Sequence, residues 1–337
     1  MSYQIKIQPS GHEFSVNGDE TLLEASLNAG FSMPYGCRNG ACGACKGKVL
    51  SGQVDLGNYQ EGALSAEEKS AGMALFCCAK AKSELVIEIK EAGGGKDIPV
   101  KTLPCRVERM EKLAADVMSL WLKLPSNERL RFLPGQYIDF LFKDGSRRSF
   151  SLANAPEDDA LLELHIRHVP GGKFTDQVFN SMKVKDIMRI SGPHGSFYLR
   201  ESDKPVILVA GGTGFAPVKS ILAHAFHHEV DRQFVLYWGA RTLADLYQPL
   251  VPSGWQQTHR NFSFIPVLSA PLADDPWPGR TGMVHQAVLA DFDDLSGYEV
   301  YVCGAPPMVQ TARREFMAKG LPQDAFFSDA FEFQAPA

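Results

Sequence analysis

Five of the seven cysteines lie in the first quarter of the chain, and four of these have the spacing of an iron–sulfur ligand set. Cys37, Cys42 and Cys45 form a C-x4-C-x2-C run, and Cys77 follows further along. A 2Fe–2S cluster needs four thiolates, and this spacing supplies three of them from one tight loop. Glycines interleaved with the cysteines allow the loop to fold closely and to turn backbone N–H groups toward the sulfurs. The run therefore predicts a 2Fe–2S cluster.

The cysteines also allow a zinc site and a different fourth ligand. A structural zinc site favours C-x2-C pairs, which the four-residue gap with its glycines does not provide. The fourth iron ligand is ambiguous because Cys77 and Cys78 are adjacent. Cys77 is preferred because Leu75-Phe76-Cys77 resembles the L-x-C that carries the last ligand in ferredoxin-like reductase domains, and Cys78 stays the alternative. Cys105 is interpreted as a small buried apolar residue.

A second group of chemically capable residues is the run Arg148-Ser149-Phe150-Ser151, one strand after Pro134–Tyr137. It resembles the R-x-[YF]-S signature of the ferredoxin–NADP reductase superfamily. The resemblance implies that the Arg148 guanidinium binds the pyrophosphate of FAD through bidentate, charge-assisted hydrogen bonds and that the Phe150 ring packs against the flavin. It also implies that Ser151 is catalytic, with its hydroxyl near flavin N5, where hydride arrives. Phe150 stands where the family more often has tyrosine, and we expect FAD binding to survive.

Two further stretches in the same region fit this resemblance. In the superfamily the first lies along the flavin, and the second binds phosphate through backbone N–H groups at a helix N-terminus. The first stretch is His165-Ile166-Arg167, at the end of an expected strand, and the second is Gly172-Lys173-Phe174-Thr175, at the start of an expected helix.

A glycine turn in the last third of the chain is suited to a nicotinamide dinucleotide. The apolar run Val206–Ala210 leads into Gly211-Gly212-Thr213-Gly214, with Pro217 shortly after. Glycines let the backbone approach a pyrophosphate, and the following helix offers its positive end. The turn lacks the G-x-G-x-x-G of ordinary dehydrogenases, but it resembles the GGTG-x-x-P of the same reductase superfamily. Cys303-Gly304 resembles the C-G-x-x-x-M of that superfamily, a motif that contacts the nicotinamide. The resemblance implies that Cys303 is a candidate catalytic residue.

Three histidines close together, His224, His227 and His228, have helical spacing that could suggest a metal site. We interpret them instead as a solvated helix face. No serine–histidine–acid arrangement is evident elsewhere in the sequence.

The composition limits what class of protein positions these residues. The chain has 337 residues and a net charge of −5, so it is long enough for two or three domains and has no basic field that favours nucleic acid. The start is alternating and polar, and no apolar stretch is long enough to span a membrane. We expect a cytoplasmic monomer.

Changes in composition and hydrophobic pattern divide the sequence into three segments, residues 1–91, 101–200 and 201–337. The first two are joined by a linker at 92–100, which includes the glycine-rich stretch Ala92–Lys96. The first segment has alternating runs at Tyr3–Gln8 and Leu85–Lys90, a helical pattern at Thr21–Ala29, and a capping box of Ser65 with Glu68. Short alternating runs in the second predict an antiparallel barrel. They are Met118–Lys123, Tyr137–Phe142, Leu161–Arg167 and Ile187–Ser191.

The third segment alternates apolar strands with helices, which predicts a Rossmann-like parallel sheet. The expected strands are Val206–Ala210, Phe234–Trp238, Phe264–Leu268 and Val300–Cys303, and the expected helices are the stretch ending at Phe226, Gly282–Leu289 and Pro306–Lys319. The sequence thus predicts a β-grasp 2Fe–2S domain, an antiparallel FAD barrel and a parallel-sheet NAD(P)H domain.

Iron–sulfur, flavin and nicotinamide motifs in this order cover nearly the whole chain. That order resembles the reductase components of ring-hydroxylating and di-iron oxygenases, and most closely the family of CDP-6-deoxy-delta-3,4-glucoseen reductases. The stretches that carry this likeness are Arg147–Pro156, Gly211–Ser220, Thr281–Leu289 and Phe326–Phe331. The resemblance implies an NAD(P)H-dependent reductase with FAD and a 2Fe–2S cluster, which passes electrons to a partner protein, a sugar dehydratase or an oxygenase.

NADH is predicted to be preferred, with NADPH possible. A 2′-phosphate needs cationic partners, but Ala270 stands where related NADP reductases carry an arginine, and Val284 replaces an aromatic residue that would stack on adenine. Arg241 remains nearby, and we expect it to pair with Asp245 at i+4 rather than to bind a phosphate.

Overall fold

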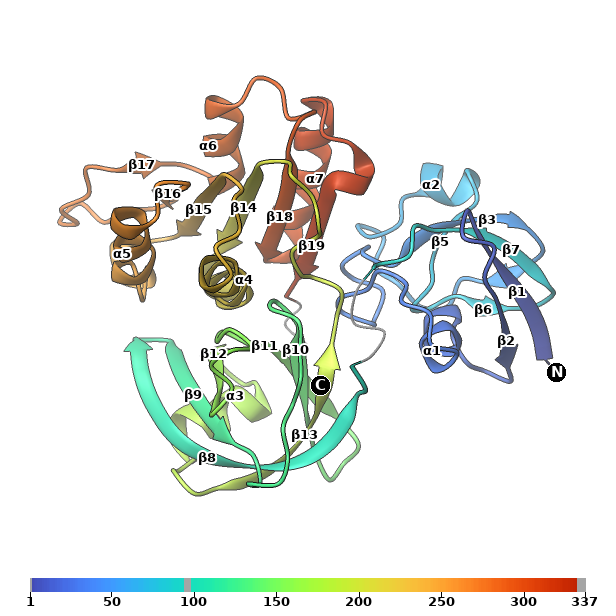
Figure 1. Cartoon of the computed structure of the whole chain (residues 1–337), viewed down its shortest axis with the longest axis horizontal. Helices are drawn as coiled ribbons and strands as arrows, with labels where there is room; N and C mark the ends of the chain where they lie inside the picture. The colour runs from blue at the N-terminus through green and yellow to red at the C-terminus, as the bar shows by residue number, and fades with distance from the viewer. Residues whose placement is uncertain (1, 94–97, 332–337) are drawn as a thin grey trace. The chain divides into compact units, whose positions relative to one another are not determined.

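The computed structural model describes residues 2–93 and 98–331, which form two compact units. The first holds the residues before Ile98, with Gly195–Phe197 and the segment that starts at Ser328. The second holds the remainder, including two six-stranded sheets. Figure 1 labels the helices and strands of both units.

The first unit is built on a five-stranded sheet in the order β2-β1-β7-β3-β5. The terminal strands β1 and β7 pair in parallel at its centre, and the other pairs are antiparallel. Together with a helix after the first hairpin, this arrangement is the predicted β-grasp. The elements are β1 (Ser2–Gln8), β2 (Glu13–Asn17), α1 (Leu22–Asn28), β3 (Lys46–Ser51), β4 (Val54–Asp55), α2 (Ala66–Ser70), β5 (Met73–Leu75), β6 (Lys80–Ala81) and β7 (Leu85–Glu88).

Local sequence explains these elements. Ile5 and Ile7 alternate with exposed residues on β1 and are fully buried in the core. Both helices begin with a capping box, in which a Thr or Ser side chain and a glutamate three residues later satisfy each other's backbone N–H groups. These boxes are Thr21 with Glu24 and the predicted Ser65 with Glu68.

The second unit begins with an antiparallel sheet in the order β11-β10-β13-β8-β9-β12. A bridge between Leu152 and Leu164 brings its two edge strands together, as closure of a barrel requires. The elements are β8 (Lys101–Ala114), β9 (Val117–Lys123), β10 (Tyr137–Leu141), β11 (Arg147–Ser151), β12 (Leu162–Arg167), α3 (Lys173–Asn180) and β13 (Ile187–His194).

The last sheet has the order β17-β16-β15-β14-β18-β19, with parallel pairing from β17 through β18. Figure 1 shows α4 and α5 on one face and α6 and α7 on the other. Its elements are β14 (Val206–Gly211), α4 (Phe215–His227), β15 (Phe234–Ala240), α5 (Leu250–Thr258), β16 (Phe262–Leu268), β17 (Arg280–Thr281), α6 (Val284–Asp291), β18 (Glu299–Gly304), α7 (Pro306–Ala318) and β19 (Phe326–Ala330).

Strand order in this sheet reverses at β14, because β15 lies on one side of it and β18 on the other. Ligands of open α/β sheets bind at such a switch point, beyond the carboxyl ends of the strands. The two nicotinamide motifs stand at this point, Gly211 at the end of β14 and Gly304 at the end of β18.

Every strand and helix expected from the sequence is present, and no end is shifted by more than three residues. Of the predicted linker, residues 94–97 lie outside the described residues, while Ala92 is buried and donates its N–H to the carbonyl of Ser32. Gly195–Phe197 and residues 328–331 belong to the first unit, although the predicted boundaries placed them in the second and third domains. No described helix is long and apolar enough to cross a membrane.

Candidate functional site: cysteine loop, barrel strand and glycine turn

The loop before β3 turns its backbone N–H groups toward cysteine sulfurs. Cys37 Sγ accepts from the N–H groups of Ala41 and Cys42 at 3.4 and 3.3 Å. Cys42 Sγ accepts from Cys37 and Ala44 at 3.4 and 3.5 Å, and Cys45 Sγ accepts from Cys77 at 3.4 Å. Such donors stabilise thiolate charge. The loop therefore fits a thiolate-bound cluster.

Thiolate character is strongest at Cys37. Its pKa is lowered to about 6, first by a hydrogen bond with the Cys42 side chain and also by backbone N–H groups of the loop, against the opposing effect of burial. The loop requires glycine at Gly40, where φ is +78° and a Cβ would lie 2.8 Å from Cys78 Sγ. A Cβ on Gly36 would lie 3.0 Å from the carboxylate of Asp329, so these two residues approach closely.

The Cys77 thiol lies beside Cys45, and the Cys78 thiol lies next to that of Cys77. The Cys77 thiol makes a hydrogen bond with Cys45, which raises its pKa. Cys78 Sγ is 3.6 Å from Cys77 Sγ and packs against Gly40. This placement supports Cys77 as the fourth ligand, and the assignment stays a prediction. Cys105 is buried in the barrel core, as expected.

Asp329 is a residue of this unit that the sequence did not single out. It is fully buried, and burial raises its pKa to about 7, with a further contribution from Cys37. It lies on β19, almost three hundred residues after Gly36, which it approaches closely, so no local sequence signal connects it with the cysteine loop.

The barrel holds the predicted flavin residues on β11 and α3. Phe150 packs on Phe174, with ring centroids 5.3 Å apart, which brings the R-x-F-S strand to the start of α3. Gly172 is the N-cap of this helix, and Thr175 Oγ1 bonds the N–H and carbonyl of Val169 to fix the preceding turn. Ser149 donates to Asp139, and Ser151 is buried.

Strand β12 uses its three predicted residues differently. His165 is buried between Glu163 and Tyr247, with ring nitrogens 2.9 and 3.0 Å from their oxygens, and Ile166 belongs to the barrel core. Only Arg167 directs its side chain to the glycine turn, where a Cβ on Gly212 would lie 3.3 Å from its Nη2. This buried Nη2 has no hydrogen-bond partner among the described residues, while Nη1 bonds Asp116 at 3.1 Å. An anionic ligand would satisfy it.

The glycine turn and the Cys303-Gly304 turn pack directly on one another. A Cβ on Gly214 would lie 2.2 Å from the carbonyl oxygen of Cys303, and one on Gly304 would lie 3.2 Å from the Cα of Gly211. Trp238, which the sequence did not predict, donates from Nε1 to the carbonyl of Gly212 at 2.9 Å and stacks on Phe215. Because its glycines have no side chains, the backbone of the turn is open to the approach of a dinucleotide.

Three features of the predicted cofactor preference can be located. Arg241 Nε lies 3.4 Å from the carboxylate of Asp245, which is the i,i+4 pair that the spacing predicts. Val284 is buried against Gly239, and a Cβ on Gly239 would lie 2.8 Å from the Cβ of Val284. Ala270 donates its N–H to the carbonyl of Arg241.

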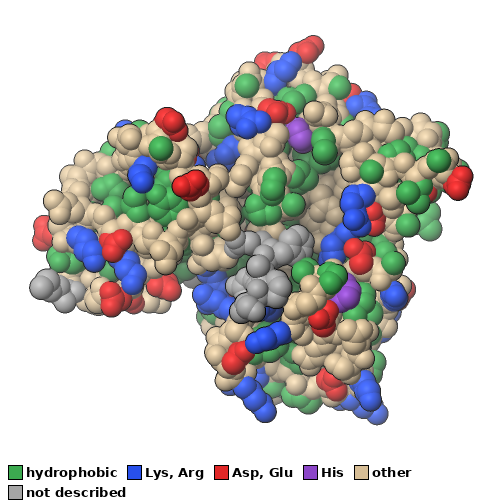
Figure 2. Space-filling model, turned by 180° about the vertical axis from the view of Figure 1, so that it is seen from behind, with side chains coloured by type: hydrophobic (Ala, Val, Ile, Leu, Met, Phe, Trp, Pro, Cys, Tyr) green, Lys and Arg blue, Asp and Glu red, His purple; other side chains and the backbone are tan. Residues whose placement is uncertain are grey.

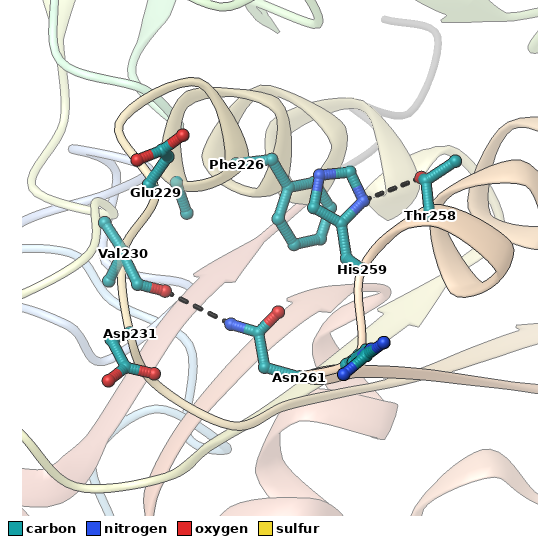
Figure 3. Close-up of a pocket in the computed structure, with 9 residues that line it drawn as sticks. Phe226, Glu229, Val230, Asp231, Thr258, His259 and Asn261 are labelled. Atoms are coloured by element: carbon teal, nitrogen blue, oxygen red, sulfur yellow. Dashed lines mark hydrogen bonds between the residues drawn. The ribbon is translucent and has the colours of Figure 1, made fainter.

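A pocket elsewhere in this domain is remote from the motifs. Figure 3 shows His259 stacked on Phe226 and bonded to Thr258, with Asn261 donating to the carbonyl of Val230. These residues precede β15 and β16, at the amino ends of the strands. The glycine turn follows the carboxyl end of β14, so the pocket and the turn lie at opposite ends of the parallel strands. Figure 2 shows acidic and basic side chains intermixed on the face it presents.

Family models match all three parts of the chain. Residues 5–82 match a 2Fe-2S iron-sulfur cluster binding domain, residues 104–198 an oxidoreductase FAD-binding domain, and residues 208–314 an oxidoreductase NAD-binding domain. These matches follow the order of the motifs and show all three cofactors, a 2Fe–2S cluster, FAD and a nicotinamide dinucleotide.

Full-length relatives are reductases of two kinds. The CDP-6-deoxy-L-threo-D-glycero-4-hexulose-3-dehydrase reductase of Yersinia pestis is 40% identical and covers 98% of this chain and 99% of its own. The phenol hydroxylase P5 protein of Acinetobacter pittii is 35% identical, covering 95% and 92%. A solved structure, the cytochrome P450 reductase of Amycolatopsis, has a TM-score of 0.79 and 35% identity and covers 98% of both chains.

Proposed function

Since this chain belongs to the family of NAD(P)H-dependent reductases that carry electrons through FAD and a 2Fe–2S cluster, we propose that its electron acceptor is a 3-dehydratase of a nucleotide-linked 4-keto-6-deoxyhexose. The observation that carries the proposal is the 40% identity over 98% of the chain to a hexulose-3-dehydrase reductase, against 35% for oxygenase reductases such as the phenol hydroxylase component.

A bound flavin takes two electrons with a hydride and releases them singly, and a 2Fe–2S cluster accepts them one at a time. We infer that the residues of this chain bind and orient these groups. The Gly211–Gly214 turn and Arg167 would hold the dinucleotide pyrophosphate, and Cys303-Gly304 would border the nicotinamide. Arg148 and the N-terminus of α3 would hold the FAD pyrophosphate, while Phe150 and Ser151 would flank the flavin.

The cysteine loop would then hold the cluster through Cys37, Cys42, Cys45 and Cys77. Its N–H···S contacts supply fixed positive dipoles, which favour the thiolate form of the ligands. The loop belongs to a unit distinct from the barrel and the nucleotide sheet, and its task is to hand single electrons to the partner protein.

The second candidate acceptor is an oxygenase component, favoured by the P450 reductase whose structure covers 98% of this chain. The two candidates are separated by reconstitution. The holoenzyme and NADH are supplied to a hexulose 3-dehydratase and, in parallel, to a phenol hydroxylase. We expect deoxygenated sugar from the first and little hydroxylated product from the second. Efficient hydroxylation without sugar product would reverse the proposal.

A further inference from the structure

Two histidines of α4 converge on one carboxylate of the barrel. His224 Nδ1 is 2.8 Å and His228 Nε2 is 2.9 Å from the same oxygen, Oε1 of Glu157. The two rings lie with centroids 4.4 Å apart. All three candidate ligand atoms lie within 4.8 Å of one another.

The histidines alone do not make this cluster. His224 and His228 are four residues apart, so they project from the same side of the helix, and the sequence favoured a solvated face for them. Glu157 precedes His224 by 67 residues and lies in the loop between β11 and β12. The fold, rather than a local motif, supplies the third group.

The cluster has the chemistry of a cation site. Two imidazole nitrogens and a carboxylate are the ligand set of His2Glu zinc sites, in which water takes the fourth position. Tetrahedral Zn²⁺ with ligands at about 2.0–2.1 Å holds ligand atoms about 3.3 Å apart. The two histidine–carboxylate contacts would lengthen by about half an ångström to reach that spacing, and the two imidazole nitrogens, which lie within 4.8 Å of each other, would move closer together.

The charge and access of the three side chains also fit. Burial raises the pKa of Glu157, but hydrogen bonds from His228 and His224 outweigh it, so that the pKa is lowered overall and the carboxylate is ionised. The side chains of Glu157, His224 and His228 are 25%, 30% and 51% exposed, which leaves a path for an ion and for water.

We propose that Glu157, His224 and His228 form a Zn²⁺ site, separate from the electron-transfer groups. Bound metal would join the β11–β12 loop of the barrel to the last turns of α4, the helix that begins directly after the glycine turn. The site would fasten the flavin-binding barrel to the nucleotide-binding sheet and would take no part in the redox chemistry.

The test is calorimetric titration of Zn²⁺ into chelator-treated holoenzyme that retains its cluster and flavin. His228→Ala and Glu157→Ala each remove one ligand, and each is expected to weaken binding at least about tenfold. His227→Ala is the matched control, because this neighbouring histidine is exposed on the same turn but outside the cluster. It is expected to bind like the wild type.

A second readout is independent of activity. Zn²⁺ should raise the midpoint of thermal flavin release in the wild type and in His227→Ala, and not in His228→Ala. Equal Zn²⁺ affinity in the wild type and His228→Ala would overturn the proposal. Loss of binding in His227→Ala, or no binding to the wild type, would overturn it as well.

Discussion

At the scale of single residues, some candidate site residues belong to a short sequence motif and others are brought to the site only by the fold. The C-x4-C-x2-C run is local, so it identified a loop whose N–H groups do point at Cys37 and Cys42, while Cys45 accepts from the N–H of Cys77. The choice between Cys77 and Cys78 depends on which thiol turns inward, which spacing does not determine. Asp329 left no signal because its contact with the loop joins opposite ends of the chain.

The adjacent cysteines give a matched pair of variants. Cys77→Ser should abolish or strongly alter the electron paramagnetic resonance signal of the reduced cluster, because serine cannot replace a thiolate without disturbing the iron. Cys78→Ser should keep a normal signal, because Cys77, whose thiol bonds Cys45, is the proposed ligand. The reverse pattern would make Cys78 the ligand.

The two adjacent arginines of β11 serve in the same way. Arg148→Ala should weaken FAD binding about tenfold to a hundredfold, as the loss of roughly 1.5–3 kcal/mol of a charge-assisted hydrogen bond implies. Arg147 is exposed and its side chain faces the opposite side of the strand. Arg147→Ala should therefore retain FAD. Flavin retention through gel filtration and dilution measures both, and equal retention would count against Arg148.

At the scale of elements, the hydrophobic pattern predicted two kinds of strand. On β1, buried and exposed residues alternate, and on β14 almost every residue is buried. The pattern did not place β8, whose fourteen residues carry mixed exposure, or β19, which closes the last sheet near the C-terminus. It also missed the contacts between elements. Glu163 on β12 meets Lys219 on α4 at 2.5 Å and His165 at 2.9 Å, in a buried cluster.

This buried pair predicts how stability depends on pH. Burial raises the pKa of Glu163, but His165 and Lys219 outweigh it and lower the pKa to about 2. Because the folded pKa is below the ordinary value, the ionised form stabilises the fold above about pH 4.5, and the contribution is lost as pH falls toward 2. Lys219→Met should cost about 3 kcal/mol at pH 7.

The loss is measured by denaturant unfolding followed by flavin fluorescence. Adding Glu163→Gln to Lys219→Met should recover much of it, because no buried charge is then left without its partner. The difference between Lys219→Met and the wild type should also shrink as pH falls below 4.5. A difference independent of pH, with no recovery in the double variant, would contradict this role.

The segments after β15 and β16 predict cofactor preference. Arg241 is held by Asp245, which would also repel a 2′-phosphate, so kcat/KM should be higher for NADH than for NADPH. Initial rates with ferricyanide as acceptor measure it. Asp245→Asn should narrow the preference by releasing Arg241. A higher kcat/KM for NADPH that falls sharply in Arg241→Ala would make Arg241 a phosphate ligand.

For the whole molecule, the order of motifs predicted the β-grasp, barrel and parallel-sheet folds, because each motif belongs to one kind of domain and chain order follows the family. Domain limits were harder to predict. Gly195–Phe197 and the segment from Ser328 join the first unit through contacts such as the Ser196–Tyr35 hydrogen bonds, which no composition shift reveals.

The central claim is that one chain moves electrons from NADH through FAD to a 2Fe–2S cluster held by the cysteine loop. The most direct measurement is anaerobic addition of NADH to the holoenzyme, with electron paramagnetic resonance of the frozen sample. The wild type should show a reduced 2Fe–2S signal, and Cys42→Ser should bleach its flavin and still reduce ferricyanide without that signal. Flavin bleaching by NADH in the wild type with the cluster left oxidised would contradict the account.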